Sequence, residues 1–235
     1  MSNEVLLVMS ILIIYGSQLL FFKLFGKYGL YCFTSIATIA ANIEVLIVIK
    51  AFGMEMTLGN VLFASTFLVT DIISELYGKN EAKRAVNLGI ATSVVFIVLS
   101  QWWLLYTPAD KDFAMPAMHT IFSNTPRLML VSMLVYAVVQ RFDVWAYHKW
   151  WELTEKTFGN RDRFLWLRNN GSTLISQLLN NLLFTFGAFL GVHDMETLIS
   201  IVISSYGIFI VTSLADTPFV YLARKIHTKE KQKLK

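Results

Sequence analysis

Seven stretches of about 20 mostly apolar residues divide this chain, and they constrain its fold more than any other feature. They cover residues 5–22, 30–49, 58–77, 85–106, 128–148, 172–190 and 198–222. Stretches of this length suit helices that cross a bilayer, because backbone groups cannot stay unpaired in lipid. Only 15% of the 235 residues are charged. The sequence therefore predicts an all-α integral membrane protein of about seven transmembrane helices, forming a single domain over residues 1–235.

Lysine and arginine are distributed unevenly between alternate connections. Sixteen of the 20 basic residues fall on one predicted side, three fall on the other, and Arg141 lies within a span. The positive-inside rule then predicts an external N-terminus, a cytoplasmic C-terminus and a basic cytoplasmic tail over residues 224–235. The net charge of +4 follows from this bias. A nucleic-acid partner is not expected, because no connection combines a basic patch with stacking aromatic residues.

Tryptophan and tyrosine gather at the predicted ends of the spans. Such residues typically anchor a helix at the membrane interface, and we expect this role for most of them. The residues concerned are Trp102, Trp103, Tyr106, Trp145, Trp150, Trp151 and Trp166.

Carboxylates and amides inside the spans are the informative residues. A charged side chain near the bilayer centre costs about 2.5–3.5 kcal/mol even on a lenient scale. These side chains are therefore expected to face one another, a cavity or water. The set comprises Asn42, Glu44, Asp71, Glu75, Gln140, Asp143, Gln177, Asn180, Asn181 and Asp216.

Helical spacing places several of these residues on common faces. Asp71 and Glu75 are four residues apart, and Gln177 and Asn180 are three apart. Asp71 lies eight residues before Lys79, which places it about 12 Å from the predicted cytoplasmic end. Similar counts put the other central residues at a similar depth. One further face comprises Tyr136, Gln140, Asp143 and Tyr147.

A structural role is the alternative for each of these residues. Amides in membrane helices often only bond neighbouring helices, and Asp216 precedes Thr217-Pro218, where it would satisfy backbone groups at a kink. Basic residues near the cytoplasmic end would neutralise Glu75 and Asp143. The candidates for that role are Lys79, Arg141 and Lys149. The block of residues 168–172 suits a helix N-cap at the membrane boundary, with a gating role for Arg168 as the alternative.

Carboxylates, amides and aromatic rings together suit the edge and face of a nucleobase, and they would also suit a cationic amine. They suit a phosphate poorly. The sequence has no phosphate-binding glycine loop, no metal-ligand spacing among its histidines and no nucleophile paired with a base. We therefore expect no metal, no cofactor and no enzyme. A small intramembrane enzyme and a purely structural membrane protein are the competing hypotheses from other classes.

Three sequence blocks resemble the queuosine precursor transporter family, also called the vitamin uptake transporter family. The first is residues 69–79, VTDIISELYGK, which places two acids and a Tyr-Gly break inside one span. The others are QRFDV at 140–144, preceded by Arg127 and Ser132, and WLRNNGST at 166–173, followed by Ser176-Gln177. Asn42 and Lys50 match the family as well. The resemblance extends from about residue 40 onward.

The resemblance implies a six-helix core to which residues 5–22 add an extra helix. It also implies uptake of a 7-deazaguanine-type base, either the nitrile base, the aminomethyl base or queuine, across a bacterial plasma (inner) membrane. A substrate-capturing subunit of a multi-component importer is the alternative. A homo-oligomer and a separate energising subunit are both left open. The expected substrate-binding residues are Asn42, Glu44, Asp71, Glu75, Gln140, Asp143, Gln177 and Asn180. Arg168 and Asp216 are the candidates for gating or coupling.

Overall fold

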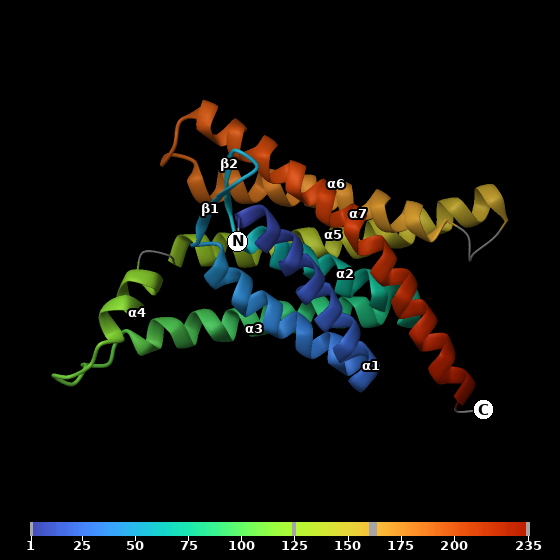
Figure 1. Ribbon diagram of the computed structural model, residues 1–235, viewed down its shortest axis with the longest axis horizontal. Coiled ribbons are helices and arrows are strands. Elements are labelled where there is room, and N and C mark those ends of the chain that lie inside the picture. Colours follow the sequence, from blue (N-terminus) through green and yellow to red (C-terminus); the bar gives the residue numbers. More distant parts are fainter. Residues whose placement is uncertain (1, 124–125, 160–163, 234–235) are drawn as a thin grey trace.

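The computed structural model describes residues 2–123, 126–159 and 164–233. The part described consists of helices, one β-hairpin and the segments that connect these elements (Figure 1). The elements in order are α1 Asn3–Glu44, β1 Val48–Ala51, β2 Met54–Thr57, α2 Gly59–Tyr77, α3 Lys79–Trp103, α4 Met115–Phe122, α5 Pro126–Phe158, α6 Leu165–Phe189 and α7 Met195–Lys233. Residues 224–233 of the predicted basic tail continue α7.

Helix α1 consists of two arms that meet at Gly26. The backbone of Gly26 has φ 59° and ψ −141°, a left-handed conformation that glycine adopts without steric cost. The arms run back along each other, and the rings of Phe21 and Phe33 lie 6.1 Å apart across them (Figure 1). They correspond to the first two predicted spans. The predicted end at residue 49 is wrong, because the helix ends at Glu44 and β1 begins at Val48.

The small hairpin formed by β1 and β2 was not predicted. The antiparallel pairing joins Val48 to Thr57 and Ala51 to Met54, across a two-residue turn at Phe52 and Gly53. Both turn residues have positive φ, as a two-residue type I′ hairpin turn requires.

Within the residues that the structure describes, five helices are long and apolar enough to cross a membrane, namely α1, α2, α3, α5 and α7. Helix α6 is absent from this set because its sequence is rich in polar residues, although its 25 residues suffice in length. The two arms of α1 together with α6 would bring the total to seven, and that count stays a prediction. Helix α2 lies at the centre: 78% of its most apolar window is buried, against 22–39% in the other four.

The bundle exposes many apolar side chains and buries many polar ones, the reverse of a soluble protein. Large apolar side chains such as Ile13, Val98 and Ile203 are more than half exposed. The interior, by contrast, contains fully buried polar side chains on several helices, including Gln18, Thr173 and Asp216. A bilayer accounts for both facts, because lipid solvates the apolar exterior while polar groups pair inside. The chain is a multi-pass membrane protein.

The connections collect at two opposite ends, which fits the predicted alternation of sides. The N-terminus, the hairpin, α4 and the α6–α7 connection lie toward one end, and the C-terminus lies at the other (Figure 1). Contacts agree: Glu4 accepts a hydrogen bond from the backbone N–H of Phe52, while Lys27 pairs with Glu81 at 3.0 Å. Which end faces the cytoplasm stays a prediction.

Two helix boundaries depend on unusual backbone conformations. Gly78, with φ 86°, ends α2 by donating its N–H to the carbonyls of Ile73 and Ser74, as the Tyr-Gly break predicted. Helix α6 begins at Leu165, preceded by Phe164 in a left-handed conformation. The prediction that the block of residues 168–172 caps this helix is therefore wrong, since the whole block lies inside it.

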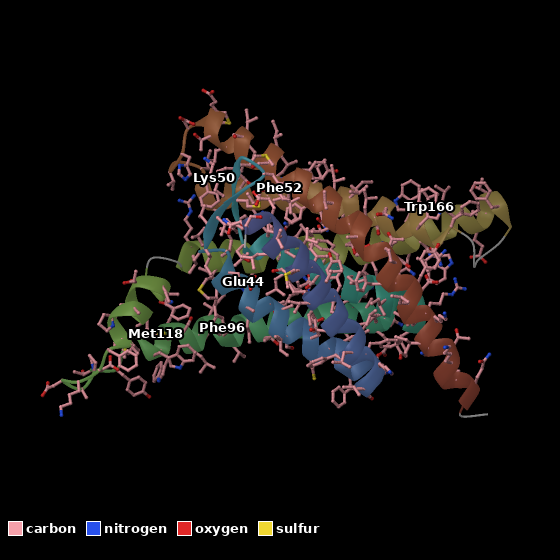
Figure 2. All side chains as sticks on the ribbon, in the orientation of Figure 1. Glu44, Lys50, Phe52, Phe96, Met118 and Trp166 are labelled. Carbon is pink, nitrogen blue, oxygen red and sulfur yellow. The ribbon has the colours of Figure 1, made fainter. Side chains whose placement is uncertain are left out.

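Exposed tryptophans mark the ends of the bundle, as expected for interface anchors. Trp166 is half exposed near one end, and Glu44 and Lys50 lie toward the other (Figure 2). Trp151 differs from the expected pattern, because its ring lies 4.3 Å from the guanidinium carbon of Arg168 and packs in the interior network.

Candidate functional site

A polar cluster occupies the interior between α2, α5, α6 and α7. All of its members are fully buried, although they come from spans whose outer faces are apolar. The cluster, called here the central polar cluster, comprises Thr66, Thr70, Asp71, Gln140, Asp143, Asn169, Thr173, Ser176, Gln177 and Asp216. The structure thus brings together Asp71, Gln140, Asp143, Gln177 and Asp216 of the predicted site.

Gln140 is held within the protein by helix α2. Its Nε2 donates to Thr66 Oγ1 at 2.7 Å, and its Oε1 accepts from Thr70 Oγ1 at 3.2 Å. Both ends of the amide are therefore satisfied, which is how membrane helices commonly bond one another. The geometry favours a structural role for Gln140.

Helix α6 presents donors to acids on two other helices. Thr173 Oγ1 donates to Asp71 Oδ2 at 2.9 Å, and Asn169 Nδ2 donates to Asp216 Oδ1 at 2.6 Å. Asn169 and Thr173 are four residues apart and share one helix face. Asp216 thus binds a side chain of α6 rather than the backbone of its own kink.

Several buried atoms of the cluster have no hydrogen-bond partner within the described residues. They include both polar atoms of the Gln177 amide, both oxygens of Asp143 and the second carboxylate oxygen of Asp71. Ser176 Oγ lies near Asp143 but outside hydrogen-bond geometry. A buried polar group without a partner costs about 1–3 kcal/mol. Sites that bind a polar ligand tolerate this cost, because the ligand supplies the missing partners.

A charged network closes the end of this cluster that lies away from the β-hairpin, called here the inner end because it is the end predicted to face the cytoplasm. Arg168 Nη2 contacts both carboxylate oxygens of Glu75 at 2.7 Å, and Arg168 Nε contacts Oε2 at 3.0 Å. Tyr147 donates its hydroxyl to the same carboxylate at 2.9 Å, and Arg224 approaches it to 3.8 Å. Glu75 is neutralised by Arg168 and Arg224 rather than by the predicted Lys79, Arg141 or Lys149. This network joins α2, α5, α6 and α7.

Two small adjoining cavities lie on the side of the cluster nearer the β-hairpin, and they are called here the outer cavities because that side is predicted to face outward. Their volumes are about 30 and 10 Å³, well below the usual size of a ligand pocket. Asn180 lines one and Asn42 lines the other, and both cavities share Phe63 and Ser132. Asn42 Oδ1 has no hydrogen-bond partner in the described part of the chain. The predicted residues Asn42 and Asn180 therefore lie near each other, one layer outside the acids.

Glu44 is the predicted site residue that lies apart. It is the last residue of α1, half-buried near the β-hairpin, and it lines neither of the two outer cavities (Figure 2). Its position is the end of a helix rather than the interior of a span.

Sequence reasoning missed several side chains that complete the site. Thr66 and Thr70 hold Gln140, and their spacing of four residues just before Asp71 was the available signal. The aromatic residues Phe63, Phe184 and Phe209 line an outer cavity. Nothing in an apolar stretch distinguishes such rings from lipid-facing ones.

Comparison with known proteins identifies the family to which this chain belongs. Residues 57–223 match the family described as "Putative vitamin uptake transporter". A protein of Bacillus subtilis (strain 168), described as "Probable queuosine precursor transporter", is 40% identical over 208 residues, covering 88% of this chain and 89% of the relative. No solved structure matches the chain. On both grounds, this chain belongs to the vitamin uptake transporter family.

Proposed function

We propose that this chain imports a 7-deazaguanine-type precursor of queuosine across the plasma (inner) membrane of a bacterium. The external N-terminus and cytoplasmic C-terminus expected from the basic residues would place the outer cavities toward the outside. The Glu75–Arg168 network would then face the cytoplasm. In this proposal the base passes through unchanged, and the chain catalyses no reaction.

The unpartnered polar atoms of Gln177 and Asp143 carry the proposal. A guanine-like ring has a ring N–H and an amino group beside a carbonyl oxygen. A carboxylate such as that of Asp143 accepts two N–H groups, while an amide such as that of Gln177 both donates and accepts. Each atom left unpaired in these two side chains thus has a chemical counterpart on the base.

In this proposal, the aromatic residues that line the outer cavities bind the face of the ring. Phe63 lines both outer cavities, Phe184 and Phe209 line the larger one, and Tyr136 lines the smaller one. Aromatic side chains stack on a base at about 1–3 kcal/mol per base. The small volumes of these two cavities indicate that this side of the bundle is closed, so the helices around them must separate before a base can enter.

The test measures queuosine in tRNA of a bacterium that neither synthesises it nor has a transporter of this family. The chain is expressed there, and the nitrile base, the aminomethyl base or queuine is supplied at low concentration. We expect queuosine with at least one precursor. Gln177→Ala and Asp143→Asn should abolish it, whereas Asp110→Asn, in an exposed loop, should leave it unchanged.

Absence of queuosine with every precursor, despite correct membrane insertion, would contradict uptake of this substrate class by the chain alone. Uptake that appears only when other genes of the source organism are added would instead identify a substrate-capturing subunit. Purified chain in liposomes separates these outcomes, because a self-sufficient carrier exchanges labelled base without any partner.

A further inference from the structure

Three carboxylic acids from three helices meet inside the central polar cluster. Asp71 on α2, Asp143 on α5 and Asp216 on α7 are all fully buried. They lie close enough for the charges of Asp143 and Asp216 to act on Asp71, and for the charge of Asp143 to act on Asp216. Among the described residues, no group of three or more histidine, cysteine, aspartate or glutamate side chains is placed to hold a metal ion.

The charged groups around the three acids leave them without a counter-ion. None of the salt bridges in the described part of the chain includes any of the three. Arg168 and Arg224 both bind Glu75. Two tyrosines also lie within electrostatic range of the acids, Tyr15 of α1 near Asp216 and Tyr147 of α5 near Asp71. In α3, the acid Glu81 forms ion pairs with Lys27 and Arg84.

Three negative charges cannot persist together in such an interior. Removing each ion from water costs several kcal/mol, and like charges at short range add repulsion. The acids must therefore hold protons. Asp71 and Asp216 each have one oxygen that accepts a bond from α6 and a second oxygen with no partner in the described residues, where a proton can sit.

The amide of Gln177 belongs to the proposed ligand site and also lies beside the three acids. Gln177 follows Thr173 by four residues, so it lies on the face of α6 that contacts Asp71. It is fully buried, and its amide atoms have no partner in the described residues. A base bound there and at Asp143 would favour the ionised form of Asp143 and leave the protons on the other two acids.

From this arrangement we infer that Asp71, Asp143 and Asp216 form a proton-sharing triad that couples entry of the base to entry of a proton. The inference rests on the proposed function. The base binds from the outside while the triad holds the proton. Separation of Arg168 from Glu75 then admits water at the inner end, Asp71 releases its proton into that water, and one proton leaves to the cytoplasm with each neutral base. Asp216 passes its proton to Asp71, and Asp216 is reprotonated from the outside when the empty carrier returns.

Purified protein in liposomes tests this coupling with labelled base. One pH unit, acidic outside and with the membrane potential held at zero, should drive about tenfold accumulation of the neutral nitrile base for one proton per base, because one pH unit is worth 1.36 kcal/mol. A sodium gradient at equal pH should drive none. Counterflow, the exchange of labelled for unlabelled base without a gradient, reports binding and movement separately.

Asp216→Asn is the decisive variant, because it keeps the oxygen that accepts from Asn169 but cannot hold the proton. We expect counterflow within about twofold of wild type and no pH-driven accumulation, with Asp216→Glu restoring part of it. Asp110→Asn is the exposed control. If Asp216→Asn still accumulates base with the pH gradient, or if sodium drives the wild type, the triad does not couple transport.

Absence of counterflow in the wild type with every base would instead overturn the proposed function, and the coupling would fall with it. Proton sharing is decided separately by infrared spectroscopy of the purified protein at neutral pH. The carbonyl stretch of protonated carboxylic acids should be present and should weaken in Asp216→Asn but not in Asp110→Asn. A spectrum without this band would overturn the triad whatever the transport result.

Discussion

The guanidinium of Arg168 on α6 pairs with the carboxylate of Glu75 on α2 across the inner end of the bundle, with Nη2 2.7 Å from both carboxylate oxygens. The two side chains are almost completely buried, at 0% and 5% exposure. Tyr147 and Trp151 complete the contact from α5. Four residues before Glu75 lies Asp71, so this pair separates the acids of the cluster from the end of the bundle.

Removing one partner of this pair should be costly. Glu75→Gln or Arg168→Gln leaves a buried charge without its counter-ion, at about 3–5 kcal/mol. The double variant Glu75→Gln/Arg168→Gln should cost less than the sum of the single changes. Unfolding temperatures in detergent would measure this. The exposed pair Lys149–Glu152 is the control, since Glu152→Gln should cost less than about 1 kcal/mol. Equal losses in both pairs would contradict the role given to burial.

Gln140 should matter for folding rather than for substrate affinity. Replacing it with alanine removes its bonds to Thr66 and Thr70, and such interhelical bonds average about 0.6 kcal/mol each. We expect Gln140→Ala to lower the unfolding temperature while the KM for uptake changes less than about twofold. A large rise in KM at unchanged stability would instead place Gln140 against the substrate.

The face shared by Tyr136, Gln140, Asp143 and Tyr147 was predictable because polar groups in lipid must point inward, and helical spacing then sorts them. All four are buried as expected. Their partners were not predictable. Asp71 and Glu75 share a face, yet one meets Thr173 and the other meets Arg168. Which partner each residue finds depends on which helices are neighbours, and spacing within one helix does not encode that.

Two local errors also have physical causes. Residues 48 and 49 are apolar enough to read as the end of a span, but they begin β1, and Phe52-Gly53 forms a two-residue hairpin turn. Phenylalanine rarely adopts positive φ, so the turn gave a weak signal. In α6, asparagine and serine suggested a helix start, whereas Asn169 serves as a donor to Asp216 inside the helix.

Gly78 should resist substitution for a backbone reason alone. Its φ of 86° is strained for any residue with a Cβ, although no atom lies within 4 Å of where that Cβ would be. Gly78→Ala should therefore cost about 1–2 kcal/mol. Gly16→Ala is the matched control, because Gly16 also has open space but a helical backbone, and it should not destabilise. Equal effects of the two changes on the unfolding temperature would contradict this account.

Gln177 should show opposite effects on stability and on function. Its amide is buried without partners in the described part of the chain, so Gln177→Met, which keeps most of the volume, removes an unsatisfied polar group. We expect the unfolding temperature to stay equal or rise while uptake falls at least about tenfold, which corresponds to 1.4 kcal/mol of lost binding. Thermal unfolding and initial uptake rates, measured on the same preparation, test both halves. Gln140→Met provides the contrast, since its amide is satisfied and its loss should lower stability. If Gln177→Met destabilises the protein and leaves uptake intact, the amide binds another helix rather than the base.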